Sequence, residues 1–412
     1  MFLCALLSSC ADRKAMAEYL TEQGVKKMEE GDLEKAKSNF TYAVRLDPEY
    51  APAFFHRGEV EMETEDYYRA AGDFHTAANL YKEPADKARA YSNESYSHLM
   101  TGHLDDAVET ARKALENNPA CADCHMHMGI ALLHMGDLEK SLLHLNKCLE
   151  LDVSMNGVLP DRAYVSMSLG NYKKAARDLD KYFESTEEPD VYSLVLYGYT
   201  LWGAGNIKKA VEYFEKARKE FPDVPEPFVA LGDIEFSKGN IDSARDMYNK
   251  AVWTHKISPD AHLGRCAVEY LGGDYSSAYD DCNRAKSMYA PFPGGSRAVV
   301  LGVCAQWRKG DDKWVVGALE DFIEDGDYVE WRKPILEYMA GRSDEKRLIN
   351  EMKKSNRGGN KRLCETYFAV AQMKLYRNEK SAKTYLNKTI GICPPYSMEI
   401  FTSKYQLKKF DL

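Results

Sequence analysis

The sequence repeats itself with a period of about 34 residues, and this period restricts the chain to a stack of similar units. In the first unit, which starts at residue 17, Gly24 is at position 8, Ala36 at position 20 and Phe40 at position 24. Pro48 follows at position 32. Further units start at Ala51, Ala88, Ala122, Asn156, Val191, Pro225, Pro259 and Ser296.

Each unit is expected to form two antiparallel helices joined by a turn such as Gly31-Asp32. Small residues at positions 8 and 20 let the two helix backbones approach, and position 24 fills the remaining space with an apolar side chain. The proline at position 32 prevents the second helix from continuing. One such pair cannot bury its apolar face alone, so the units must stack on one another.

The Gly, Ala, Phe, Ala and Pro signature at these positions resembles the tetratricopeptide repeat (TPR). The resemblance implies an all-α, right-handed TPR α-solenoid of about nine helix-turn-helix repeats over residues 17–329. It also implies protein binding rather than catalysis. Residues 1–16 are predicted to be a lipoprotein signal and anchor, and residues 330–412 a C-terminal helical TPR-like module. Insertions at Glu83–Lys87 and Pro293–Gly295 predict loops that bulge from the stack.

The N-terminal segment resembles a bacterial lipobox. Its apolar run from Phe2 to Leu7 is followed by Ser8, Ser9 and Cys10, although no basic residue precedes the run. The resemblance implies that Cys10 is lipidated and that the chain is an outer-membrane lipoprotein of the bacterial envelope. The alternative is a chance cysteine in a cytoplasmic protein.

The composition argues against nucleic acid as a partner. The chain has 55 Lys and Arg residues against 64 Asp and Glu residues, and the basic residues form no long cluster. Gly-rich phosphate loops, the H-E-x-x-H pattern and the G-x-S-x-G pattern are missing from the sequence. His134 and His144 lie ten residues apart, which does not suit a helical metal site. We therefore expect no catalytic residues, no metal site and no cofactor.

Residues 121–125 read C-A-D-C-H, the spacing that attaches a c-type haem. This leaves open a haem or thiol redox protein as an alternative function. The stretch falls on an ordinary junction between two repeats, where a haem would have to open the helix stack. A local Cys121–Cys124 disulfide is a further alternative in an exported protein. The ten cysteines are otherwise scattered through apolar stripes and do not predict a disulfide framework.

The first helix of each TPR unit lines the concave wall of the solenoid, so positions 2, 5, 9 and 12 should form one stripe. Here this stripe is rich in Met, Tyr and Trp, which suits an apolar helix or an extended peptide as partner. The alternative is that these side chains only pack against neighbouring helices. The predicted partner-binding groove consists of Phe55, Met62, Tyr96, Leu99, Met126, Ile130, Tyr164, Met167, Tyr192, Tyr199, Trp202 and Phe236. Within it, the segment Tyr192–Trp202 is the strongest candidate for a contact surface.

The C-terminal part is similar to the last module of NlpI-type TPR lipoproteins. The residues that carry this resemblance are Trp331, Pro334, Cys364, Glu365, Tyr367, Phe368, Ala382, Leu386, Glu399 and Leu407. The resemblance implies an adaptor that docks a periplasmic protease or cell-wall hydrolases and forms a homodimer. This chain has about twice the expected number of repeats, which leaves the partners open. An alternative is a structural component of a secretion or outer-membrane assembly machine.

Overall fold

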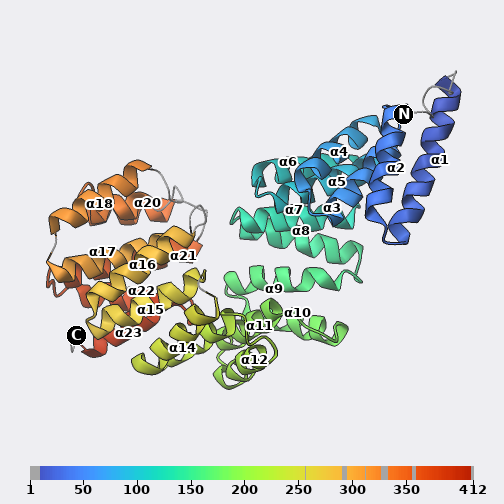
Figure 1. The fold of residues 1–412 in the computed structure, drawn as a ribbon. Coiled ribbons are helices and arrows are strands. Elements are labelled where there is room, and N and C mark those ends of the chain that lie inside the picture. The colour runs from blue at the N-terminus through green and yellow to red at the C-terminus, as the bar shows by residue number, and fades with distance from the viewer. Residues whose placement is uncertain are drawn as a thin grey trace. The chain divides into compact units, whose positions relative to one another are not determined.

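The computed structural model describes residues 10–255, 257–289, 295–310, 312–325, 333–354 and 359–409. Every regular element in these ranges is a helix, and the α-helices are numbered α1 to α23 along the chain. Consecutive helices pair as hairpins, and Figure 1 shows the hairpins of each part of the chain stacked in order. The prediction of an all-α solenoid of helical repeats is confirmed.

The chain divides into two compact units, residues 1–165 (unit 1) and residues 166–412 (unit 2). The helices of unit 1 are α1 (Cys10–Glu29), α2 (Leu33–Leu46), α3 (Ala51–Glu63), α4 (Tyr67–Leu80), α5 (Pro84–Met100), α6 (Leu104–Asn117), α7 (Ala122–His134), α8 (Leu138–Leu151) and the short 3-10 helix η1 (Asn156–Val158). The division falls inside α9 (Leu159–Ser168).

Unit 2 completes the predicted repeats and adds the C-terminal helices. Its helices are α10 (Tyr172–Ser185), α11 (Val191–Gly203), α12 (Ile207–Glu220), α13 (Glu226–Lys238), α14 (Ile241–Thr254), α15 (Pro259–Gly272), α16 (Tyr275–Tyr289), α17 (Gly295–Lys309), α18 (Asp312–Asp325), α19 (Lys333–Met339), α20 (Glu345–Lys354), α21 (Gly359–Tyr376), α22 (Ala382–Ile392) and α23 (Met398–Lys409). The predicted repeats correspond to the hairpins from α1/α2 to α17/α18.

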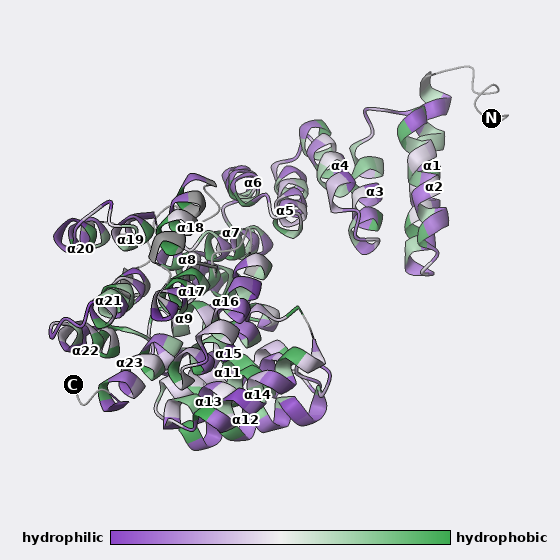
Figure 2. Ribbon diagram, turned by 60° about the vertical axis from the view of Figure 1, so that its left-hand side comes forward, coloured by the Kyte–Doolittle hydropathy of each residue, from purple (hydrophilic) through white to green (hydrophobic). Residues whose placement is uncertain are grey.

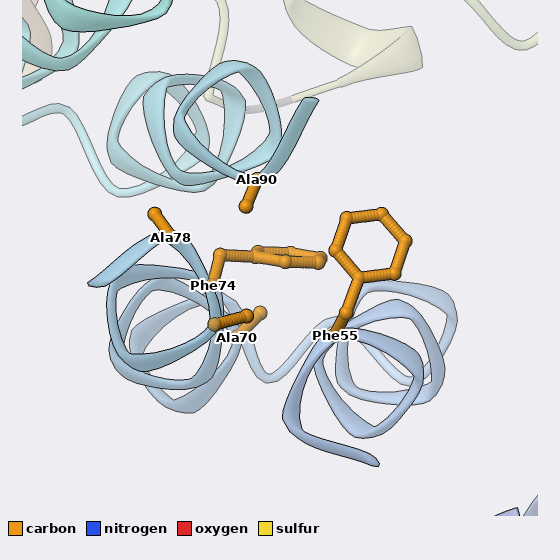
Figure 3. Packing of buried hydrophobic residues seen from close by; sticks show 6 residues of the cluster. Phe55, Ala70, Phe74, Ala78 and Ala90 are labelled. Carbon is orange, nitrogen blue, oxygen red and sulfur yellow. The ribbon is translucent and has the colours of Figure 1, made fainter. Parts of the chain in front are cut away.

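The two helices of a repeat meet where a small residue at position 8 faces the side chain at position 24. In the second repeat, a Cβ atom on Gly58 would lie only 2.9 Å from Cε1 of Phe74. Phe74 is fully buried, and Figure 3 shows its ring between α4 and Ala90 of α5, next to Phe55 of α3. The rings of Phe55 and Phe74 meet at 64° with centroids 5.4 Å apart. The predicted role of these positions is thus seen directly.

The turn inside each repeat depends on a residue with positive φ at position 15. Glycine supplies it at Gly31, Gly102, Gly136, Gly170, Gly205, Gly239, Gly273 and Gly310. In the first turn, Asp32 N–H donates to Lys27 O at 2.8 Å and Gly31 N–H donates to Met28 O at 2.9 Å. These two bonds satisfy carbonyls at the helix end, in the manner of a Schellman motif.

The same turn geometry continues beyond the predicted solenoid. Gly341 has φ 77° between α19 and α20, and Asn378 has φ 55° between α21 and α22. In the second repeat the position is held by Glu65, with φ 60°. Residues other than glycine are strained at positive φ, because their Cβ atom comes too close to the backbone.

Glu83–Lys87 was expected to bulge from the stack, and this prediction is wrong. Helix α5 begins at Pro84 and extends over 17 residues, whereas α3 and α7 have 13 residues each. Proline fits the first turn of a helix because the N–H groups there have no partner inside the helix. The insertion therefore lengthens α5 at its N-terminus. Pro293 and Gly294 of the second insertion lie outside the described residues.

The cysteines also differ from the expectation, because six of them form disulfides: Cys121–Cys124, Cys266–Cys282 and Cys364–Cys393. Cys266 and Cys282 stand at positions 8 and 24 of the eighth repeat, where the first, second and sixth repeats place Gly and Phe. The closest approach of the two helices brings these cysteines to a Cα–Cα distance of 5.4 Å. Their repeat positions, rather than their spacing in the sequence, predict the pair.

The division into residues 1–16, 17–329 and 330–412 stays a prediction. Residues 7–9 of the lipobox and Trp331 lie outside the described residues. Within the ranges that the structure describes, no helix has both the length and the apolarity needed to cross a membrane. Figure 2 shows hydrophilic and hydrophobic residues mixed along the helices.

We expect Glu65→Gly to stabilise unit 1 by about 0.5 to 1 kcal/mol, because glycine adopts positive φ without strain. The matched control is Glu63→Gly, two residues earlier at the last residue of α3, which should destabilise the unit because glycine loses more conformational freedom in a helical residue's place. Urea unfolding of the two variants measures both changes. Equal destabilisation by both would contradict the strain assigned to residue 65.

Candidate protein-binding faces

In each unit, first helices of successive repeats contact one another, and we call the surface that they present the A-helix face of that unit. In unit 1, α1 contacts α3, and α5 contacts α7. In unit 2, α11 contacts α13, α13 contacts α15, and α15 contacts α17. The predicted groove residues lie on these helices and on α9.

On unit 1, most of the predicted groove residues form a half-buried apolar row. Its members are Met62, Tyr96, Leu99, Met126 and Ile130. Half-burial leaves each side chain anchored in the unit and still accessible on one side. Such a row can bind an apolar segment of a partner, because methionine adapts its packing and tyrosine supplies contact area at a low cost in conformational entropy.

Phe55 was predicted to belong to the same row, but it is a core residue with only 1% of its surface exposed. Its ring packs against Phe74, and against Tyr81 at a centroid distance of 6.2 Å. The guanidinium of Arg89 lies over the ring at 4.3 Å. Position 5 therefore faces the neighbouring repeat at this place rather than the open side of the A-helix face.

The apolar row of unit 1 rests on a buried polar contact between repeats. His127 Nδ1 lies 2.9 Å from Ser92 Oγ, and its ring packs against Tyr96 with centroids 5.2 Å apart. Burial lowers the pKa of His127 to about 4, so the imidazole is neutral near pH 7. Ser97 Oγ also donates to Met62 Sδ at 3.2 Å. These contacts hold the side chains of Met62 and Tyr96 in place within the row.

The remaining groove predictions from α9 and the start of α11 are divided between surface and core. Tyr164 is 37% exposed and Tyr192 is 49% exposed, whereas Met167 is 7% exposed. The pattern of positions 2, 5, 9 and 12 therefore does not give a uniformly accessible stripe. Whether these residues contact a partner stays a prediction.

On unit 2, the A-helix face is covered by the chain's own C-terminal helix. Phe401 of α23 stacks on Trp202 with centroids 5.5 Å apart and an interplanar angle of 8°. It also meets Phe236 edge-on at 5.5 Å. Tyr396, just before α23, lies 5.5 Å from Tyr199. The predicted residues Tyr199, Trp202 and Phe236 thus come together, but their partner in this structure is intramolecular.

Polar contacts hold α23 in this position as well. The side-chain amides of Gln372 on α21 and Gln406 on α23 exchange hydrogen bonds of 2.9 and 2.8 Å. Lys409 Nζ donates to Leu271 O on α15 at 2.8 Å. Figure 1 shows α23 beside α15, in agreement with these contacts.

A buried carboxylate lies beneath the aromatic cluster of unit 2. Asp233 on α13 accepts hydrogen bonds of 2.7 Å from the hydroxyls of both Tyr199 and Tyr248. Burial raises the pKa of Asp233 to about 7, and the charge of Asp260 adds to this rise. The two tyrosine hydrogen bonds and Arg297 act in the opposite direction.

The C-A-D-C-H stretch is folded into the start of α7. Cys121 is the N-cap residue, and its sulfur, bonded to Cys124, accepts the Cys124 N–H at 3.1 Å. His125 Nδ1 lies 3.0 Å from His144 Nδ1, and His125 Nε2 donates to Pro119 O at 3.2 Å. Haem attachment would need both thiols and this imidazole, and all three are engaged in contacts within the protein. The alternative of a local disulfide is the one found in the structure.

The residues that cover unit 2 were not predicted from the sequence. The predicted helical module over residues 330–412 carried no indication that its last helix packs against repeats about 200 residues earlier. The buried side of α23 includes the polar residues Glu399, Thr402, Ser403 and Gln406. Hydrophobic periodicity cannot reveal a helix that buries polar side chains.

These two faces, carried by stacked helical hairpins, define a helical-repeat binding scaffold. A family model described as tetratricopeptide repeat matches residues 21–79, 93–152, 161–225 and 195–262, which is more than half of the chain. The protein therefore belongs to the tetratricopeptide repeat family.

Comparison with known proteins finds similarity mainly at the level of the repeats. The chain is 24% identical over 218 residues to the human mitochondrial import receptor subunit TOM70, a match that covers 50% of this chain. It spans about a third (35%) of that relative's length. A solved tetratricopeptide repeat protein from Parabacteroides merdae superposes with a TM-score of 0.50 at 18% identity, covering 71% of this chain and 99% of that one. PilF of Pseudomonas aeruginosa gives a TM-score of 0.46 at 18% identity, covering 52% of this chain and 96% of that one.

We expect unit 2 to lose stability as the pH rises through about 7, because the folded state holds a proton on Asp233 that the unfolded chain releases near its ordinary pKa. The stabilising effect of this proton is complete below pH 4 and is lost as the pH rises through 7. Asp233→Asn should remove this dependence and stabilise the protein at pH 8 by about 2 to 4 kcal/mol. Thermal unfolding of the wild-type protein and the Asp233→Asn variant at pH 5 and pH 8 measures the change in stability. An equal effect of the substitution at both pH values would contradict the shifted pKa.

Proposed function

We propose that the protein is a non-enzymatic scaffold of the bacterial cell envelope, held at the outer membrane by a lipid on Cys10. It presents the A-helix face of unit 1 to partner proteins. The observation that carries the proposal is the contrast between the two faces. The row on unit 1 is half-buried, whereas Trp202 and Phe236 on unit 2 are 4% and 2% exposed under α23. Partner binding is therefore assigned to the row Met62, Tyr96, Leu99, Met126 and Ile130.

The disulfides support a location outside the cytoplasm. Three disulfides form among the described cysteines, and disulfides persist in oxidising compartments but are rare in the cytosol.

The resemblance of the C-terminal part to NlpI-type lipoproteins favours an adaptor for a periplasmic protease or for cell-wall hydrolases, and a homodimer. The alternative is a component of a secretion or outer-membrane assembly machine. Both assign the same face to the partner and differ only in what binds there, so one crosslinking experiment separates them.

We expect a photo-crosslinking amino acid at Met126 to capture a partner protein in intact cells. The matched control is the same substitution at Lys140, an exposed residue of the second helix of that repeat. Mass spectrometry of the adducts identifies the partner. A protease or hydrolase supports the adaptor, and assembly or secretion proteins support the alternative. The assignment of the face is wrong if adducts form equally at both positions.

We expect Cys10→Ser to move the protein from the membrane fraction to the soluble fraction and to abolish incorporation of labelled palmitate. Cys4→Ser, six residues earlier, should leave both unchanged. The reason is that only the cysteine after Leu7-Ser8-Ser9 matches the lipobox. Membrane association of the Cys10→Ser protein would contradict the anchor.

A further inference from the structure

We propose that the Cys121–Cys124 disulfide is a thiol–disulfide exchange site that reacts with cysteine thiols of other proteins. The Cys266–Cys282 disulfide joins α15 to α16 across 16 residues, and Cys364–Cys393 joins α21 to the C-cap residue of α22 across 29 residues. Cys121 and Cys124 are only three residues apart at the start of α7. A disulfide restricts the unfolded chain least when its loop is shortest, so this pair contributes least to stability by that route.

The exposure of the two cysteines determines where an incoming thiolate attacks. Cys121 is half-buried and Cys124 is fully buried, so Cys121 is the more accessible of the two cysteines and the expected point of attack. Every cysteine of the other two disulfides is buried. Access is a main determinant of exchange rate, and the exchange is therefore selective for this pair.

The surroundings favour a thiolate on Cys121 and a neutral thiol on Cys124 in the reduced form. Cys121 is the N-cap of α7, where the Cys124 N–H points at its sulfur at 3.1 Å. The N-terminus of a helix stabilises negative charge and lowers the pKa of a thiol there. Cys124 Sγ lies 3.7 Å from Ala88 O, to which its S–H can donate once the disulfide is opened. This division of roles suits a Cys-x-x-Cys pair that opens and closes.

The exchange step balances with a protein dithiol as the co-reactant. A substrate thiolate attacks Sγ of Cys121 and forms a mixed disulfide, while the electron pair of the broken S–S bond leaves on Cys124 and takes up a proton. A second substrate thiolate then attacks the substrate sulfur of the mixed disulfide, and Cys121 leaves as a thiolate that can be protonated. The substrate loses two electrons and two protons, and the pair gains them. A protein disulfide closes the pair again by the reverse steps.

The site lies next to the proposed binding face, because Met126 and Ile130 stand on the same helix within about three turns of Cys121. A polypeptide bound along α7 would bring its cysteines close to the pair. The exchange chemistry itself is independent of the scaffold function, since it can be measured with glutathione alone.

The first test is a redox titration of the full-length protein in glutathione buffers of increasing reducing strength. Thiols are trapped by alkylation, and each cysteine peptide is quantified by mass spectrometry. We expect Cys121 and Cys124 to be reduced in a buffer in which both other pairs stay oxidised. Reduction of all three pairs together, or of Cys121–Cys124 last, would overturn the proposal.

The second test compares two variants that each leave one cysteine without its partner. Cys124→Ser frees Cys121, and Cys282→Ser frees the fully buried Cys266. Oxidised glutathione should form a mixed disulfide on Cys121 at least about tenfold faster than on Cys266, because Cys121 is accessible and its thiolate is stabilised. Equal rates in two variants with unchanged circular dichroism would overturn the proposal. Should Cys282→Ser fail to fold, the titration of the wild-type protein decides alone.

Discussion

The structure depends on the close approach of two helix backbones at positions 8 and 24 of each repeat. Glycine at one position accommodates a large side chain at the other, as in Gly58 with Phe74 and Gly232 with Tyr248, where a Cβ atom would lie 2.9 and 2.6 Å from the ring. In the eighth repeat, a disulfide between Cys266 and Cys282 joins the two helices at these positions. Packing at this point fixes each hairpin, and stacking of the hairpins then exposes one helix of each pair along a shared face.

The two A-helix faces show how repeats of one design acquire different roles. On unit 1, the apolar row around Tyr96 and Met126 stays half-buried. On unit 2, the equivalent face is occupied by Phe401 and Tyr396. The repeat signature sets the scaffold, and the side chains and segments that it carries determine which part can accept a partner.

The period was sufficient to predict the helices, their pairing and the hairpin turns, because each of these is determined within about 34 residues. Predictions failed where distant segments meet. Phe55 has the same repeat position as Met126, yet the ring of Phe74 and the guanidinium of Arg89 enclose it. The pairing of Cys364 with Cys393 and the position of α23 depend on tertiary packing that no local pattern encodes. The repeat positions predicted which helices carry the proposed groove residues, but not which of their side chains remain accessible.

Helix α23 also changes the order in which the protein can fold. Contacts in unit 1 join neighbouring repeats, so its hairpins can assemble one after another from the N-terminus. Unit 2 instead ties Trp202 to Phe401 and Leu271 to Lys409, separations of about 200 and 138 residues. Its A-helix face therefore stays uncovered until the C-terminal helix has packed against it. During that interval, the partly folded chain exposes an aromatic surface that chaperones recognise and that can cause aggregation.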